Sequence, residues 1–342
     1  MSTLLVSDLP AWLVLLFAFL FGAAWGSFFN VAIYRWPRDM SVVSPPSHCP
    51  ACGAPIPAWR NVPILGWLLL RGRAACCGAK VSPRYFAVEL LSALLAVALA
   101  EQVIVRSASS TTLLDAALSA GLYFVFVGGL LVATFVDLEW MEIPDEVSIG
   151  GTAIGLATAT LRFPSPDLED LVLGAGVGFL FVQLVLVWSW ERLTGRRGMG
   201  EGDAKLLMLI GVFLGWQGAA FALVAGAIQG MIVAAVMLAT GRSARPADPA
   251  PATDTTPEAD TEDTWTAPAP LTTKDGVEAS LEDQGRALSV RDRHRRLLWD
   301  WRGEDPSLLR RAIPFGPFLA LAALEFLFFG TPLLDLYFGL FE

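Results

Sequence analysis

Long apolar runs without a single charged residue constrain this sequence more than any other feature. The first run, Leu9–Tyr34, is too long for the apolar core of a cleavable signal peptide and lacks its basic start, so we predict that it is a retained membrane span. Only 17% of the residues are charged, whereas a soluble domain carries about 25%. The composition therefore excludes a simple cytosolic globule.

Several other runs reach or approach the roughly 20 apolar residues that a helix needs to cross a bilayer. Leu206–Thr240 is uncharged and long enough for two short crossings if Gly215–Gly218 forms a turn, whereas Val147–Leu161 is short and rich in Gly and Ala, which favours a place inside a bundle. The remaining candidates are Phe86–Val105, Ala116–Val136, Leu171–Trp190 and Ala312–Leu334. The sequence predicts an all-α polytopic membrane protein with about eight transmembrane helices.

Lys and Arg are distributed unevenly along the chain. Of the 24 basic residues, 22 lie in the segments Arg35–Arg84, Glu191–Lys205 and Arg242–Arg311, and only Arg106 and Arg162 lie elsewhere. With the predicted spans, these three segments share one side of the membrane. Because basic loops stay in the cytoplasm, we expect this side, with the short loop 137–146, to be cytoplasmic and both termini to lie outside.

An acidic stretch accounts for the formal net charge of −9, because residues 246–285 hold ten acidic residues and a single basic one. Pro246–Pro270 has too few apolar residues to form a core, so we predict a disordered acidic linker there. Arg286–Trp301 is basic with interspersed Leu and Trp, which is typical of a helix held at anionic lipid. The charge gives no reason to expect a nucleic-acid partner.

All four cysteines, Cys49, Cys52, Cys76 and Cys77, lie in the first predicted cytoplasmic loop. In a reducing compartment such a cluster favours a metal over disulfides, and four thiolates suit a tetrahedral, structural zinc with no open position for water. Cys76 and Cys77 are adjacent rather than separated by two residues, so their side chains should diverge and be harder to aim at one ion. His48 could replace a missing thiolate, although a solvated His is the simpler interpretation.

Two groups of acidic residues flank predicted spans. Asp137 and Asp145 follow the third span, and Asp203 stands at the start of the sixth, between Gly200, Gly202 and Lys205. Two carboxyl groups that meet in a partly dry site can share one proton, and such a pair can act as base and acid in peptide hydrolysis. The glycines would let a substrate backbone approach closely. The alternative is that Asp145 and Asp203 are N-caps of their helices, and that Glu139, Glu142 and Glu201 are solvated.

Two further acids, Glu89 and Glu325, fall within predicted spans. An acid inside a membrane is costly and marks a functional hypothesis. Pairing with a polar group on a neighbouring helix, or retention of the proton, explains each equally well, and we assign neither a role.

Several motifs, in order along nearly the whole chain outside Arg242–Arg311, resemble those of the bacterial type IV prepilin peptidases, a family of GxGD aspartic membrane proteases. They are Gly26–Pro37, Asn61–Leu65, Leu70–Arg73, Pro83–Glu89, Asp137–Asp145, Gly200–Leu206 and Ile313–Ala320.

The resemblance implies a bifunctional inner-membrane enzyme. Such proteins cut the short basic leader from prepilins or pseudopilins on the cytoplasmic side and then methylate the new N-terminus with S-adenosylmethionine. Asp137 and Asp203 would be the catalytic pair, with Asp145, Gly200, Gly202 and Lys205 as supporting residues, and the cysteine loop would hold zinc. No glycine-rich nucleotide loop follows a strand, so the methyl-donor site stays unassigned.

The sequence departs from the family pattern in two places. The cysteine loop usually contains two Cys-x-x-Cys pairs, but here Ala74 stands at the third cysteine position, Cys77 matches the fourth and Cys76 is shifted. The second departure is the insert before the last span. The expected organisation is a first span (1–34), a cysteine loop domain (35–85), a peptidase core (86–240), the insert (241–311) and a last span (312–342).

Two other function classes compete with the peptidase. A transporter that relays protons would need acids near the membrane midplane, and Glu325 is the one good candidate. A scaffold with a zinc-containing docking loop explains the cysteines but gives the segment Gly200–Asp203 no purpose.

Overall fold

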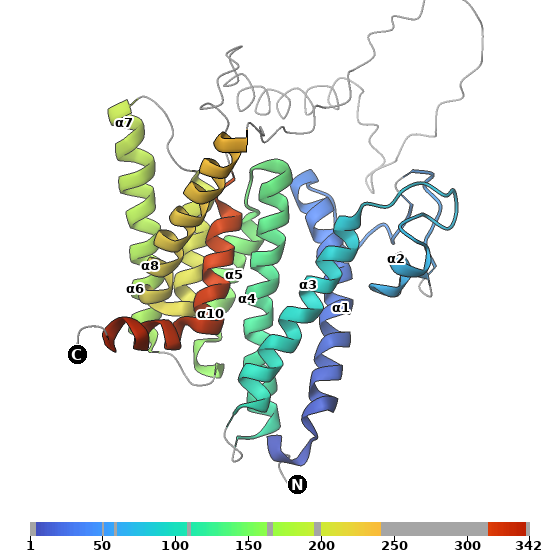
Figure 1. Ribbon diagram of the computed structural model, residues 1–342, viewed down its shortest axis with the longest axis horizontal. Helices are drawn as coiled ribbons and strands as arrows, with labels where there is room; N and C mark the ends of the chain where they lie inside the picture. The colour runs from blue at the N-terminus through green and yellow to red at the C-terminus, as the bar shows by residue number, and fades with distance from the viewer. Residues whose placement is uncertain are drawn as a thin grey trace, which may run out of the picture. The chain divides into compact units, whose positions relative to one another are not determined.

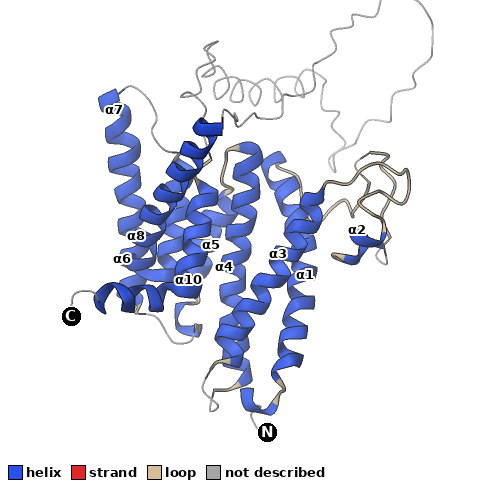
Figure 2. Ribbon diagram, viewed as in Figure 1, coloured by secondary structure: helices blue, strands red, loops and turns tan. Residues whose placement is uncertain are grey.

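The computed structural model describes residues 5–49, 51–57, 60–107, 111–162, 167–194, 200–240 and 314–339. Within these ranges the regular structure is helical, and the extended pairing amounts to isolated bridges such as His48 with Pro55 (Figure 2). This confirms the predicted all-α class. The predicted acidic linker and the predicted basic helix of the insert lie outside the described residues.

The helices follow the apolar runs, and local capping signals set several of their starts. Figure 1 shows how these helices are arranged. Ser82, with Pro83 behind it, caps one helix, and Thr112 and Asp167 cap two others through side-chain oxygens. The main helices are α1 (Ala11–Arg35), α2 (Leu65–Leu69), α3 (Pro83–Leu99), α4 (Leu113–Trp140), α5 (Asp145–Ala157), α6 (Leu168–Phe181), α7 (Trp190–Thr194), α8 (Glu201–Thr240) and α10 (Gly316–Gly339). Two π-helical segments, Ala100–Val105 and Val182–Ser189, prolong α3 and join α6 to α7.

Five helical segments within the described ranges are long and apolar enough to cross a membrane: Ala11–Arg38, Pro83–Val105, Leu113–Trp140, Leu168–Leu193 and Glu201–Thr240. The turn predicted in the longest run is confirmed at Gly215, whose φ of 71° and ψ of −177° break α8. α5 and the apolar part of α10, Gly316–Gly330, are shorter. The chain is therefore a multi-pass membrane protein, and the count of eight spans stays a prediction.

Small residues bring α1 and α3 into close antiparallel contact. A Cβ at Gly22 would lie 2.6 Å from the Ser92 carbonyl oxygen, and one at Gly26 would lie 2.6 Å from the Glu89 Cα. The Ser92 hydroxyl donates a 2.7 Å hydrogen bond to the Gly22 carbonyl. Small residues that let helix backbones approach this closely are typical of membrane helix pairs.

Contacts between helix ends are concentrated at one end of the bundle. The Arg38 guanidinium, just beyond α1, lies 4.6 Å from the Trp140 ring at the end of α4, and Arg84 at the start of α3 pairs with Glu139 of α4. The starts of α5, α8 and α10 lie at the same end. We call this the shared end; α1 and α4 finish there, at the top of Figure 1.

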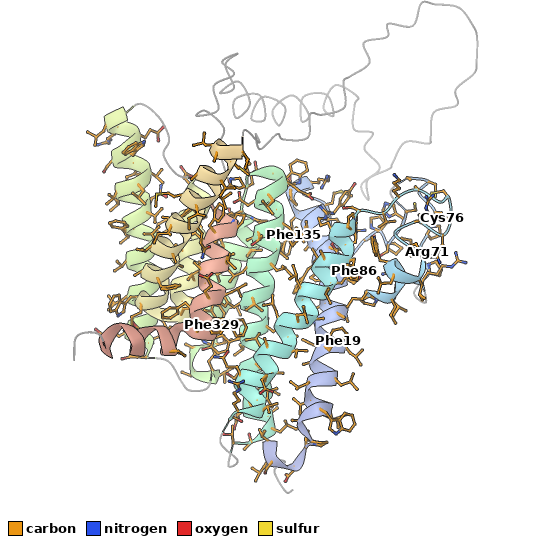
Figure 3. All side chains as sticks on the ribbon, viewed as in Figure 1. Phe19, Arg71, Cys76, Phe86, Phe135 and Phe329 are labelled. Carbon is orange, nitrogen blue, oxygen red and sulfur yellow. The ribbon has the colours of Figure 1, made fainter. Side chains whose placement is uncertain are left out.

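The cysteine loop between α1 and α3 leaves the bundle at the shared end and is anchored to it by Glu89. The carboxylate of Glu89 accepts a 2.7 Å hydrogen bond from the Ile64 backbone N–H, where the φ of 64° places a non-glycine residue in a rarely populated conformation. Trp67 also stacks on Phe86, with ring centroids 5.2 Å apart. Figure 3 labels Phe86 on α3 and, in the loop beside it, Arg71 and Cys76. Glu89 thus has a backbone partner in the loop, and its side chain also has a hydrogen bond with Ser27 of α1. Of the two explanations that the sequence left open for this acid, pairing with a polar group on a neighbouring helix is confirmed.

Candidate functional site

Asp137 lies in the last turn of α4 and is only 6% exposed. The helix ends at Trp140, because Met141 follows it with a positive φ of 55° as a left-handed C-cap. The carboxylate of Asp137 accepts a buried 2.9 Å hydrogen bond at Oδ2 from the backbone N–H of Gly316. Gly316 is the first residue of α10, so this N–H is one of those that the helix itself leaves without a partner. The start of α10 therefore holds Asp137 in place.

Asp203 is the third residue of α8 and is 8% exposed. Its Oδ2 accepts a 3.2 Å hydrogen bond from the backbone N–H of Gly200, the residue just before the helix. An acid at this position that bonds back to the preceding backbone forms half of a capping box. The alternative that Asp203 is the N-cap of α8 is wrong, because Asp203 lies inside the first turn of the helix.

The two carboxyl groups lie on neighbouring segments at the shared end, because the glycines beside them contact one side chain, that of Ile143. Ile143 lies 3.2 Å from the position of a Cβ at Gly202, the neighbour of Asp203, and 3.3 Å from that of a Cβ at Gly316, which binds Asp137. Two buried carboxyl groups that come close to each other can share one proton. Such a pair can act as a base toward water and as an acid toward a carbonyl or amine.

Asp145 and Lys205 lie beside this pair and bind each other. The Lys205 Nζ donates a 2.6 Å hydrogen bond to the Asp145 Oδ1, and the two side chains are 30% and 60% exposed. Pro144 occupies the N-cap position of α5, so the prediction that Asp145 is the N-cap is also wrong. The ion pair joins the start of α5 to the start of α8, and its exposure limits its contribution to stability to about 0–1 kcal/mol.

Gly200 and Gly202 both lie where a side chain would be in tight contact with its neighbours. A Cβ at Gly200 would lie 3.3 Å from the Asp203 Oδ2, and one at Gly202 would contact Ile143 as described. Gly316, which had no predicted role, belongs with them. The signal available in the sequence was the Pro-Phe-Gly-Pro run just before the last apolar helix, but nothing in that run names its partner.

Four exposed acids lie close to Asp137 or Asp203 in the sequence: Glu142, Asp145, Glu146 and Glu201. The expectation that Glu142 and Glu201 are solvated is confirmed by their exposure. Glu139 differs, because it pairs with Arg84.

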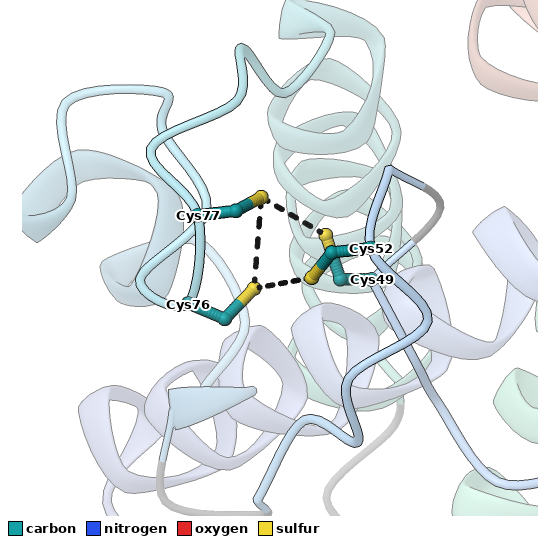
Figure 4. Close-up of side chains that lie close together, drawn as sticks. All are labelled: Cys49, Cys52, Cys76 and Cys77. Atoms are coloured by element: carbon teal, nitrogen blue, oxygen red, sulfur yellow. Dashed lines mark hydrogen bonds between the residues drawn. The ribbon is translucent and has the colours of Figure 1, made fainter.

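The four cysteine thiols converge in the loop, as Figure 4 shows. The sulfur atoms of Cys49, Cys52, Cys76 and Cys77 all lie within 4.8 Å of one another. The Sγ–Sγ distances are 3.8 Å for Cys49–Cys77, 3.3 Å for Cys52–Cys76 and 3.9 Å for Cys76–Cys77. Tetrahedral zinc with bonds of about 2.3 Å separates its sulfurs by about 3.8 Å. The thiols therefore fit zinc, and the expectation that the adjacent pair would diverge is wrong.

The loop gives these thiols different acidities. The backbone N–H groups of Ala51 and Cys52 stabilise the Cys49 thiolate and lower its pKa to about 6. Hydrogen bonds with Cys52 and Cys49 raise the pKa of Cys76 to about 12. A bound metal ion would have to displace the thiol protons that remain.

Glu325 of α10 accepts a 2.8 Å hydrogen bond from the side-chain amide of Gln229 in α8. Of the two explanations that the sequence left open for this acid, pairing with a polar group on a neighbouring helix is confirmed.

Two family models match this chain. Residues 20–103 match the family model described as the bacterial peptidase A24 N-terminal domain, and residues 124–235 match that of the type IV leader peptidase family. No solved structure matches the chain.

Several curated relatives carry the name prepilin leader peptidase/N-methyltransferase. The protein of Myxococcus xanthus is 34% identical, over 95% of this chain and 93% of its own length. That of Aeromonas hydrophila is 36% identical, over 71% of this chain and 88% of its own. That of Klebsiella pneumoniae is 38% identical, over 59% of this chain and 85% of its own. The resemblance seen in the motifs is thereby confirmed, and the chain belongs to the type IV leader peptidase family.

Proposed function

We propose that this protein removes the leader peptide of type IV prepilins or pseudopilins at Asp137 and Asp203 and then methylates the newly exposed N-terminus. The name of the relatives supports both activities. The observation that carries the proposal is that two buried carboxyl groups, each held by a backbone N–H group, lie at the same end of a membrane bundle.

In the proposed reaction the two aspartates share one proton across a water molecule. The ionised carboxylate takes a proton from the water while the oxygen of the water attacks the scissile carbonyl carbon. The protonated carboxyl group of the other aspartate gives its proton to the carbonyl oxygen. The roles then reverse: the carboxyl group that took the proton of the water gives it to the amide nitrogen, and the other takes back the hydroxyl proton as the carbonyl forms again. The C–N bond breaks, the amine leaves, and the pair again holds one proton. The pair titrates as a unit, so neither residue is assigned the first proton.

The backbone supports this chemistry by fixing one oxygen of each carboxyl group. Gly316 binds Asp137 at Oδ2 and Gly200 binds Asp203 at Oδ2. In this proposal the second oxygen of each group faces the water and the peptide. The ion pair of Asp145 with Lys205 supports the start of α8, which carries Asp203.

The surroundings of the pair suit a basic leader peptide. Glu142, Asp145, Glu146 and Glu201 are exposed around the shared end, and opposite charge favours the encounter with such a peptide. The cysteine loop and Arg38 lie at the same end, and basic loops stay in the cytoplasm. We therefore place the site at the cytoplasmic face of the inner membrane.

For the second activity, S-adenosylmethionine is the proposed methyl donor. When bound, it would supply a methyl group to the new N-terminal amine, which would give up a proton. The residues that bind the donor stay unassigned.

Mass spectrometry of one substrate tests both activities. The purified protein in lipid is incubated with a prepilin, first alone and then with S-adenosylmethionine. We expect the leader to be lost in the first reaction, and a single methyl group to be added to the shortened chain in the second. An intact prepilin overturns the peptidase proposal, and a shortened but unmethylated product restricts the protein to cleavage.

We further propose that Cys49, Cys52, Cys76 and Cys77 hold a structural zinc ion. Four sulfur ligands leave no open position on the metal, so zinc would fold the loop and take no part in hydrolysis.

Replacing Cys49 with serine tests this zinc site. We expect Cys49→Ser to lower the zinc content from one ion per chain to nearly none, because a hydroxyl is a poor substitute for a thiolate ligand. His48→Ala is the matched control, since His48 lies outside the sulfur cluster and should leave the metal in place. Metal analysis of the purified proteins decides; equal zinc in Cys49→Ser, or loss in His48→Ala, contradicts the assignment.

A further inference from the structure

Arg162 is the largest fully buried side chain among the described residues, at 1% exposed. The sequence placed it with Arg106 as one of two basic residues on the side opposite the other 22. Its burial shows that it is no surface charge. A buried guanidinium is costly unless its donors find partners, so its contacts indicate what it does.

The guanidinium binds the last carbonyls of two helices. Nη2 donates to the carbonyl oxygens of Gly155 in α5 and Val212 in α8, each at 3.1 Å, and Nη1 donates to that of Phe213 at 3.3 Å. Val212 and Phe213 precede the break of α8 at Gly215. A helix leaves these carbonyls without partners and carries negative charge at this end. Arg162 therefore caps α5 and the first part of α8 together.

Aromatic rings extend the contact to α4. Arg162 lies 4.7 Å from the centroid of the Phe213 ring, and this ring stacks on Phe126 of α4 with centroids 4.5 Å apart and planes 11° apart. The helices α4, α5 and α8 carry Asp137, Asp145 and Asp203. The side chain of Arg162 and the rings that pack against it thus connect these three helices at one depth in the bundle.

On each helix, the contact with Arg162 or its neighbouring rings lies at nearly the same distance from the aspartate. Phe126 precedes Asp137 by 11 residues, while Gly155 and Phe213 follow Asp145 and Asp203 by 10 residues each. At about 1.5 Å per residue these intervals measure roughly 15–17 Å. A shift of one helix at this level would therefore move its carboxyl group relative to the others.

We propose that Arg162 is a positioning residue that sets the spacing of Asp137 and Asp203 from the opposite end of these helices. The inference rests on the proposed peptidase function. It concerns the rate of the chemical step, because the exposed acids that would meet the substrate lie far from Arg162.

Arg162→Met tests the proposal, with Arg106→Met as the matched control. Arg106 is 71% exposed and pairs with Glu101, so its loss should leave cleavage unchanged. We expect Arg162→Met to lower kcat by about 30-fold with KM within about twofold, because misplacing a reacting group by about 1 Å can cost 100-fold in rate. Arg162→Lys keeps the charge but offers one compact donor group, and should lose less.

Two further measurements separate positioning from stability. The pH of maximal kcat should move in Arg162→Met, because the interaction of two carboxyl groups depends on their separation. Phe126→Leu should also lower kcat, and the double variant should lose less than the two single losses combined. Gel filtration and thermal unfolding report the folded fraction of each variant.

The outcomes are distinct. A folded Arg162→Met with kcat within twofold of the parent overturns the inference, and so does a loss of kcat that only follows a loss of folded protein. Cleavage that survives in Asp137→Asn and Asp203→Asn overturns the proposed function itself, whatever the Arg162 variants do.

Discussion

Asp137→Asn and Asp203→Asn are each expected to lower leader cleavage by about 10³-fold or more. An amide neither accepts the proton of the attacking water nor supplies an acidic proton to the carbonyl oxygen, and a single catalytic group is commonly worth this much. The shape of the side chain is preserved, and the amide oxygen can still accept the hydrogen bond from Gly316 or Gly200. Single-turnover cleavage of a prepilin, followed by mass spectrometry, measures the effect.

Asp115→Asn is the matched control. Asp115 is exposed in the first turn of α4, at the opposite end of the helix that carries Asp137, and the substitution removes the same charge. Its cleavage rate should equal that of the parent. If a folded Asp137→Asn or Asp203→Asn retains a tenth of the parent rate, hydrolysis does not depend on this pair.

The apolar runs were sufficient to predict the fold class because a membrane helix must be long and apolar whatever it packs against. They also located the break in α8, since Gly215 is the residue with the positive φ there. The exact starts of helices were harder to predict. Aspartate is a residue type that is common at N-caps, but the N-cap of α5 is Pro144. Asp145 instead binds Lys205, which lies 60 residues away in the sequence.

Local motifs in the sequence nominate Asp137 and Asp203 as candidates, but the surroundings of both residues depend on contacts between distant segments. Gly316 is 179 residues from Asp137, and no local pattern predicts that hydrogen bond. By its charge alone Arg162 is an ordinary basic residue, whereas its hydrogen-bond partners belong to α5 and α8. The adjacent cysteines were expected to diverge, and only the path of the loop brings their sulfurs together.

The contact between Gly316 and Asp137 leaves no room for a side chain. A Cβ at Gly316 would lie 2.7 Å from the Asp137 Oδ2 and 3.3 Å from its Cγ. Both are tighter than ordinary van der Waals contact, and Asp137 is buried, so its carboxyl group would have to move away from the N–H that holds it. The backbone itself tolerates alanine at the start of a helix.

Gly316→Ala is therefore expected to lower cleavage by about 100-fold while the protein remains folded, because a displacement of about 1 Å at a reacting group has this effect. The loss should appear in kcat, measured by single-turnover cleavage beside thermal unfolding of the same sample. Gly176→Ala is the matched control, because a Cβ at Gly176 of α6 would meet no heavy atom within 4 Å. Cleavage within threefold of the parent in Gly316→Ala would mean that this backbone N–H does not position Asp137 for hydrolysis.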